Sequence, residues 1–185
     1  MKIITTKIPE VKIIQPQVFG DERGFFFESF QQERYCQMLE IHETFVQDNI
    51  SRSEKNVLRG LHYQLQQMQG KLVTVITGCV FDVAVDLRVN SPTYAQWVGV
   101  ELSSDNKRQL WVPKGFAHGF LVLSDYADFY YKCTDYYHPQ SEKSILWNDQ
   151  DIAINWPIDG MPLLSEKDSK ASQLNELSSD DLPKY

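Results

Sequence analysis

Eight short segments with the composition of β-strands follow one another between residues 45 and 134. They cover residues 45–51, 57–64, 71–77, 80–87, 97–102, 109–112, 120–123 and 127–134. Turn-forming residues separate them, as Gly78 does between the third segment and the fourth. Many short strands at this spacing are typical of a β-sandwich or a β-barrel. The sequence therefore predicts an all-β fold. No repeat or linker divides residues 1–185, so we expect a single domain.

The segment FDVAVDL shows how one strand would divide between two environments. Side chains alternate between the faces of a strand. One face would carry Phe81, Val83, Val85 and Leu87, and the other Asp82, Ala84 and Asp86. We expect the apolar face to join the core and the other face to meet water or a polar cavity.

The ends of the chain differ from this pattern. Residues 11–19 form a strand candidate that Pro16 makes an edge strand or breaks in two. In GDERGFFFESF we expect tight turns around Arg23, followed by phenylalanines that belong to the core if no ligand is bound. Ser29 is expected to cap a helix with Tyr35, Met38 and Leu39 at helical spacing. Beyond Leu164 the chain is polar, which predicts a short helix and a frayed end.

Charge and cysteine content exclude several classes of protein. A net charge of -7 and a pI near 5.1 argue against a surface for duplex nucleic acid, since such a surface must be basic. The sequence contains no secretory signal and no apolar run of membrane-spanning length, so we expect a cytoplasmic protein without membrane contact. Cys36, Cys79 and Cys133 are odd in number and far apart, which favours reduced packing residues.

The segment from Asn56 to Lys71, NVLRGLHYQLQQMQGK, carries most of the reactive side chains of the predicted strands. Arg59 and His62 are three residues apart, so a flat strand would place them on opposite faces. If Gly60 bulges the strand, both side chains can share one cavity. The alternative is an ordinary strand with a buried histidine and a solvated arginine.

Two kinds of chemistry suit a closed β-domain with these residues. A cupin-type metal oxygenase needs clustered ligands, but His42, His118 and His138 are scattered and no second histidine lies near His62. Acid/base chemistry needs a base, an acid and a cation that stabilises an oxyanion. His62, Tyr131 and Lys71 provide one of each. The segment PKGFAHGF would place His118 in a turn before a strand, where a histidine is more often structural than catalytic.

Motifs along most of the chain resemble one enzyme family. They are GDERGFFFESF, FVQDNISRS, VLRGLHYQ, QGKLVTVITGCVFDVAVDLR, SPTYAQWVGVELS, QLWVPKGFAHGFLVLSD, YKCTDYY and LSEKD. Together they are similar to the dTDP-4-dehydrorhamnose 3,5-epimerase family from about Thr5 to Asp168. The resemblance implies a cupin-type jelly-roll barrel with a few short helices near both ends, assembled as a homodimer without metal or other cofactor. It also implies conversion of dTDP-4-dehydro-6-deoxy-D-glucose to dTDP-4-dehydro-L-rhamnose, a step toward surface polysaccharide.

The same resemblance assigns roles to individual residues. His62 would remove the protons at carbons 3 and 5 with support from Asp168. Lys71 would stabilise the enolate, and Tyr131 would return a proton from the opposite face. The substrate-binding positions it implies are Arg23, Glu28, Gln47, Asp48, Asn49, Arg59, Lys71, His118, Tyr137, Glu142 and Lys167.

The same motifs are compatible with other activities. The chain could act at one carbon only, or as a ketoisomerase on a related dTDP-sugar, because such enzymes share the histidine and the sugar-binding frame. It could also be a nucleotide-sugar-binding module without activity. Tyr131 alternates with Phe129 and Cys133 on its strand and could be a core residue. Asp82 and Asp86 could serve the pocket or face solvent.

Overall fold

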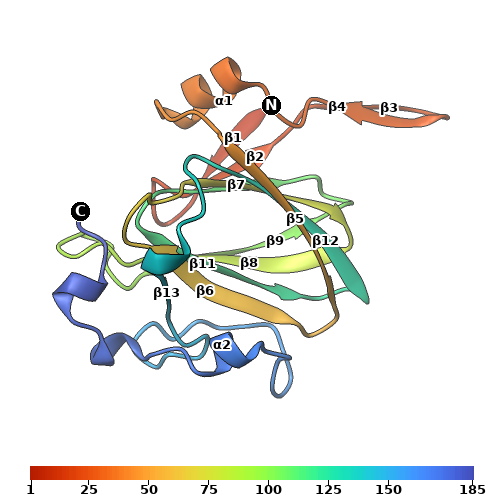
Figure 1. Ribbon diagram of the computed structural model, residues 1–185. Coiled ribbons are helices and arrows are strands. Elements are labelled where there is room, and N and C mark those ends of the chain that lie inside the picture. Colours follow the sequence, from red (N-terminus) through yellow and green to blue (C-terminus); the bar gives the residue numbers. More distant parts are fainter.

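Two antiparallel β-sheets face each other in the computed structural model, which describes residues 1–185 (Figure 1). The strands of the first, in spatial order, are β1 Lys2–Thr5, β2 Lys12–Gln15, β10 Gln109–Val112, β7 Lys71–Thr77, β12 Tyr126–Cys133 and β5 Gln47–Glu54. The strands of the second are β13 Glu142–Ser144, β6 Leu58–Gln64, β11 Phe116–Val122, β8 Cys79–Asp86 and β9 Trp97–Ser103. The predicted all-β fold class is confirmed.

Apolar side chains hold this arrangement together in three layers. Between the sheets lies a core that includes Val73, Val75, Ala84, Phe120 and Phe129. The outer face of the second sheet packs on the C-terminal part of the chain, through residues such as Leu61, Val83, Val85, Trp147 and Trp156. The outer face of the first sheet is covered by α1, Gln32–Leu39, through Tyr35 and Leu39. Each fully buried large side chain contributes about 1.5–3 kcal/mol to stability.

The alternation predicted for FDVAVDL is confirmed in β8. Val83, Val85 and Leu87 pack against the C-terminal part of the chain. Ala84 belongs to the core between the sheets, and Asp82 is fully buried on that same strand face. The carboxylate of Asp82 therefore lies inside the barrel and does not meet solvent.

The prediction for PKGFAHGF is wrong in one respect. Strand β11 begins at Phe116, so His118 lies inside a central strand and not in a turn. The turn ends at Gly115, which has a φ of 81°. Gly119 lies within β11 and does not form a turn. Its lack of a side chain lets β11 approach β6 closely. A Cβ at Gly119 would lie 2.6 Å from the carbonyl oxygen of Arg59.

The bulge expected at Gly60 is present. Between β6 and β11 the pairing shifts, so that His118 lies opposite His62 while Phe120 lies opposite Arg59. Three residue steps on β6 therefore match two on β11, which places an extra residue in β6. Gly60 has a φ of 113°, a conformation that suits glycine. Arg59 and His62 consequently face the same cavity.

Pro16 breaks the N-terminal strand candidate in two, into β2 and β3. Strand β3, Val18–Asp21, pairs only with β4, Gly24–Phe27, in a hairpin that extends away from the two sheets (Figure 1). Phe25 and Phe26 are 62% and 70% exposed, so within this chain they are not core residues. Helix α1 is capped by the side chain of Gln31 and not by the predicted Ser29.

The C-terminal end is more ordered than its polar composition predicts. The expected short helix is present as α2, Glu166–Ser169. Beyond it, Leu174 and Leu182 are buried, and the backbone N–H of Val89 donates to the carbonyl of Pro183 at 2.8 Å. The predicted frayed end is therefore wrong. No helix in the structure combines the length and the apolar character that a membrane span requires.

Candidate active site

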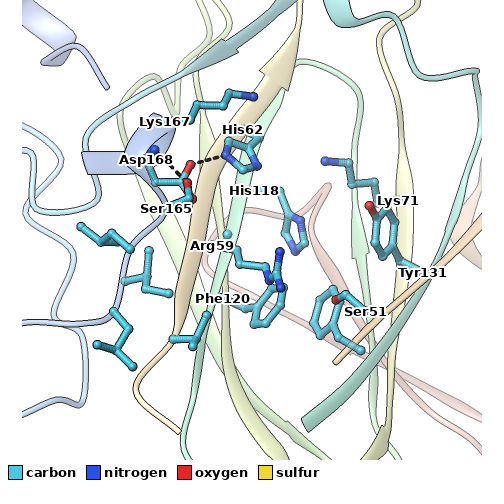
Figure 2. Close-up of a pocket in the computed structure, with 16 residues that line it drawn as sticks. Ser51, Arg59, His62, Lys71, His118, Phe120, Tyr131, Ser165, Lys167 and Asp168 are labelled. Atoms are coloured by element: carbon cyan, nitrogen blue, oxygen red, sulfur yellow. Dashed lines mark hydrogen bonds and ion pairs between the residues drawn. The ribbon is translucent and has the colours of Figure 1, made fainter. Parts of the chain in front are cut away.

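A cavity of about 440 Å³ opens between the two sheets, and reactive side chains from both sheets line it (Figure 2). The second sheet contributes His62 from β6 and His118 from β11. The first sheet contributes Lys71 from β7 and Tyr131 from β12. His62 lies on one side of the cavity, and Lys71 and Tyr131 lie on the other (Figure 2). A bound molecule would therefore meet these groups from two sides.

His62 and Asp168 form a hydrogen-bonded pair. Nε2 of His62 lies 2.5 Å from Oδ1 of Asp168, whose side chain is almost fully buried. The hydroxyl oxygen of Ser165 caps α2 by accepting the backbone N–H of Asp168 at 3.1 Å. Burial alone would raise the pKa of Asp168, but the hydrogen bond from His62 lowers it below the ordinary value. Asp168 therefore stays ionised, and its carboxylate keeps the proton of neutral His62 on Nε2.

Lys71 and Tyr131 lie partly buried in the opposite wall. Burial lowers the pKa of the Lys71 ammonium, and Cys133, Glu142 and Asp82 oppose this shift only in part. Burial raises the pKa of Tyr131 to about 12. Lys71 makes no hydrogen bond or ion pair with the other lining residues (Figure 2). Its ammonium is therefore free to bind an oxygen of a ligand, and Tyr131 keeps its proton at neutral pH.

His118 forms a second histidine–aspartate pair beside the first. Its Nε2 lies 2.9 Å from Oδ1 of Asp82, which is fully buried. The imidazole stacks near Phe129, with ring centroids 6.0 Å apart. His118, a predicted substrate-binding residue, therefore lines the cavity. For its partner Asp82 the sequence left open whether the side chain serves the pocket or faces solvent.

Three further predicted residues form a polar cluster beside the main cavity. Glu142 accepts hydrogen bonds from Tyr137, at 2.9 Å, and from Lys167. Burial opposes ionisation of Glu142, but the hydrogen bonds from Lys167 and Tyr137 hold its pKa below the ordinary value. Tyr137 and Glu142 also line a smaller cavity of about 80 Å³ that shares His62, Lys71 and Tyr131 with the main one. The cluster thus extends the site beyond the reactive centre.

Strand β5 and its neighbours bring further polar groups to the same region. Nε of Arg59 donates to Oγ of Ser53 at 2.9 Å, which fixes one edge of its guanidinium. The side chain of Gln47 donates to Asn49 at 3.1 Å and accepts the backbone N–H of Tyr137 at 2.9 Å. Gln47 and Asn49 therefore lie near the cluster of Tyr137, whereas Arg59, bonded to Ser53 further along β5, lines the main cavity.

Five predicted residues line neither cavity: Gln47 and Asn49 lie beside the cluster of Tyr137, and three others lie further away. Asp48 points to the opposite face of β5, where it pairs with Lys132 at 2.8 Å. Arg23 is on the β3–β4 hairpin and pairs with Asp21 at 2.5 Å. Glu28 follows that hairpin and pairs with Arg34 at 2.9 Å. Within one chain, none of the three lines the cavity that holds His62.

Several lining residues were absent from the sequence prediction. Ser51, Phe120 and Ser165 belong to this group. Ser51 could have been found, because alternation along β5 places it on the same face as Gln47 and Asn49. Ser165 could have been found from its spacing to Asp168, which is that of a helix N-cap. Phe120 carries no comparable indication in the sequence.

The acidic and imidazole groups are arranged in separate pairs. No group of three or more His, Cys, Asp and Glu side chains is placed to hold a metal ion. A base supported by a carboxylate, a buried cation and a protonated phenol suit removal and return of a proton beside a carbonyl group.

Comparison with known proteins agrees with this chemistry. The family model described as dTDP-4-dehydrorhamnose 3,5-epimerase matches residues 5–176. A dTDP-4-dehydrorhamnose 3,5-epimerase from Salmonella typhimurium is 59% identical over 177 residues, covering 95% of this chain and 97% of that protein.

Solved structures show the same likeness. A dTDP-6-deoxy-D-glucose-3,5-epimerase from Legionella pneumophila, in complex with dTDP-4-keto-L-rhamnose, is 62% identical with a TM-score of 0.97, covering 100% of this chain and 98% of that chain. A 3'-monoepimerase from Streptomyces bikiniensis, in complex with dTDP-quinovose, is 32% identical with a TM-score of 0.89, covering 98% of this chain and 92% of that chain.

Proposed function

The chain belongs to the dTDP-4-dehydrorhamnose 3,5-epimerase family, and we propose that the cavity between its sheets is the site at which carbons 3 and 5 are inverted. The fold is the cupin-type jelly roll that the sequence predicts for this family. The enzyme converts dTDP-4-dehydro-6-deoxy-D-glucose to dTDP-4-dehydro-L-rhamnose in dTDP-rhamnose biosynthesis. The observation that carries the assignment of the site is the position of a histidine–aspartate pair opposite a lysine and a tyrosine.

His62 acts as the base in this scheme. Asp168 accepts a hydrogen bond from Nε2, so the lone pair of Nδ1 takes the proton from the carbon beside the ketone. The electron pair of the broken C–H bond moves onto the ketone oxygen and forms an enolate. Asp168 then stabilises the imidazolium by its negative charge. One base serves both carbons, because both hydrogens project from the same face of the sugar ring.

Lys71 stabilises the enolate oxygen, and Tyr131 completes the inversion. A preorganised positive charge in a site with little water is effective where negative charge develops. Tyr131 retains its proton at neutral pH because its pKa is raised to about 12. It delivers that proton to the carbon from the face opposite His62, and solvent then restores the phenol. Return of the proton from the second face inverts the carbon.

The degree of similarity favours action at both carbons over action at one. Identity is 62% with the 3,5-epimerase from Legionella pneumophila and 32% with the 3'-monoepimerase from Streptomyces bikiniensis. A binding module without activity would have no need for a buried, unpaired lysine beside the histidine–aspartate pair. The absence of a metal cofactor and the cytoplasmic location stay predictions.

Turnover in deuterated water tests this function. Purified protein is incubated with dTDP-4-dehydro-6-deoxy-D-glucose, and NMR follows deuterium at each carbon. We expect deuterium at carbons 3 and 5 of an inverted product. Deuterium at one carbon only would support the single-centre alternative, and its absence with no product would support a binding module.

The nucleotide diphosphate has a basic group available within the chain. Arg59 keeps the two terminal nitrogens of its guanidinium free for an anion, because its hydrogen bond to Ser53 uses Nε. Gln47, Asn49, Tyr137, Glu142 and Lys167 are the other predicted contacts near the cavity. Tyr137 is 51% exposed, so one face of its ring is available for stacking on the base.

The positions of Arg23 and Glu28, outside the cavity of their own chain, support a homodimer. The β3–β4 hairpin extends from the body of the chain with Phe19, Phe25 and Phe26 62–70% exposed (Figure 1). Exposed large apolar side chains in one small element indicate a contact with another surface. The family resemblance gives Arg23 and Glu28 substrate contacts, although they lie outside the cavity of their own chain. We therefore place the hairpin of each protomer against its partner, where both residues can approach the partner's cavity.

A further inference from the structure

The buried carboxylate of Asp82 has one oxygen without a partner. Oδ1 pairs with His118, but Oδ2 accepts no hydrogen bond although Asp82 is 0% exposed. Burial of a carboxyl group with incomplete hydrogen bonding destabilises a fold. Asp86, four residues further along the same strand face, shows the contrast. Asp86 is equally buried, but its carboxylate oxygens accept hydrogen bonds from Arg88, Ser91 and Thr93.

His118 connects Asp82 to the cavity. A carboxylate accepts only, so its partner Nε2 carries a proton. Nδ1 of His118 has no hydrogen-bond partner in the protein and is not sealed in the interior, so it is the nitrogen that the cavity meets. His118 lies directly opposite His62 on the neighbouring strand, and both rings use Nε2 for an aspartate. The two pairs therefore present similar groups side by side to one ligand.

We propose that Asp82 is a positioning residue that fixes the ring and the tautomer of His118, so that Nδ1 accepts a hydrogen bond from a hydroxyl group of the sugar. This inference rests on the proposed function of the cavity. The sugar of a 4-dehydro-6-deoxy substrate has free hydroxyls only at carbons 2 and 3, so one of these is the donor. The contact orients the sugar ring so that the hydrogens of carbons 3 and 5 point toward His62, which lies opposite His118 on the neighbouring strand.

The variant Asp82→Asn separates positioning from structure. The introduced amide can turn either its oxygen or its nitrogen to the ring, so it no longer holds the proton on Nε2. We expect kcat/KM to fall about 10-fold, the effect of one hydrogen bond. The melting temperature should stay equal or rise, because the variant removes a buried and poorly partnered carboxyl group. Long-range ¹H–¹⁵N spectra of His118 should change from the Nε2–H form to a mixture of tautomers.

Asp86→Asn is the matched control. It makes the same chemical change on the same strand face, but it weakens a fully partnered carboxylate outside the cavity. We expect a lower melting temperature and an unchanged kcat/KM for the folded protein. If this variant does not fold, Ser91→Ala removes only one partner of Asp86 and serves the same purpose.

Substrate analogues test the contact itself. One of the two analogues, 2-deoxy or 3-deoxy, lacks the donor hydroxyl. With that analogue, the decrease that Asp82→Asn causes in the rate of hydrogen exchange at carbon 5 should disappear. An equal penalty with both analogues would overturn the proposal. So would wild-type kinetics of Asp82→Asn, or imidazolium signals from His118 in the wild-type complex. Failure of the proposed function is distinguishable, because the wild-type protein would then exchange no hydrogen at all.

Discussion

The ammonium group of Lys71 lies in the cavity wall, and burial lowers its pKa. Because folding lowers this pKa, the unfolded chain binds the proton more tightly than the folded chain does. The protonated side chain therefore destabilises the fold. This destabilisation decreases as the pH rises through the lowered pKa toward the ordinary value of 10.5. Such a conflict between charge and burial is common at catalytic positions.

Lys71→Met replaces the cation with an apolar chain of similar length. We expect kcat to fall about 10²- to 10³-fold, because the enolate loses its counter-charge. The melting temperature at pH 7 should equal or exceed that of the wild type. Lys132→Met is the control, since Lys132 pairs with Asp48 on the outer face of the sheet. A change in KM alone would show that Lys71 binds substrate without stabilising the enolate.

His62→Ala tests the single base. Exchange of hydrogen for deuterium should disappear at both carbons, because no other group takes the proton in the proposed scheme. His42→Ala changes an exposed histidine outside the cavity and should leave exchange intact. Exchange that persists at one carbon of the His62→Ala variant would require a second base.

At the scale of elements, two local devices bring the reactive groups together. The bulge of β6 directs the side chains of Arg59 and His62 toward the same cavity. The positive φ of Gly60 makes the bulge possible. The four-residue helix α2 places Asp168 beside His62, with Ser165 at its N-cap. The bulge and the helix are both short, and each depends on one or two residues for its geometry.

Ser165→Ala tests the second device. Loss of an N-cap costs about 1 kcal/mol of helix stability. Asp168 would then hold His62 less firmly, and we expect kcat to fall about 3- to 10-fold, the range for one hydrogen bond. Ser169→Ala is the control, because its hydroxyl donates to the exposed end of the same helix. If both variants keep wild-type kcat, the cap has no part in positioning Asp168.

Local patterns in the sequence predict most of these elements. Strands β7 and β10 begin and end at the predicted residues, and the bulge at Gly60 follows from the odd spacing of Arg59 and His62. The incorrect predictions concern the role of one glycine and the contacts between residues that are far apart in the sequence. Gly119 resembles a turn residue, but it serves close contact between strands. The polar tail is ordered by partners that lie near Val89, which no local pattern reveals. The expected single domain stays a prediction.

At the scale of the whole molecule, the exposed hairpin is the basis of the proposed homodimer. Phe26→Glu places a charge in the proposed contact. We expect the protein to become monomeric in sedimentation experiments, and kcat/KM to fall because Arg23 and Glu28 no longer reach the partner. Met161→Glu is the control, because Met161 is 74% exposed and lies outside the hairpin. A wild-type monomer with full activity would contradict the proposed dimer.

In the proposed mechanism the two facing sheets act on opposite faces of the sugar ring, and Tyr131→Phe tests this arrangement most directly. The variant removes only the hydroxyl, so His62 and Lys71 can still form the enolate, and packing should hardly change. With no acid on the far side, the proton returns from the side of His62. In deuterated water, NMR should therefore show deuterium entering unconverted substrate while little inverted product forms. Inversion of carbon 5 at close to the wild-type rate would contradict the account, because the proton would then come from water or another residue.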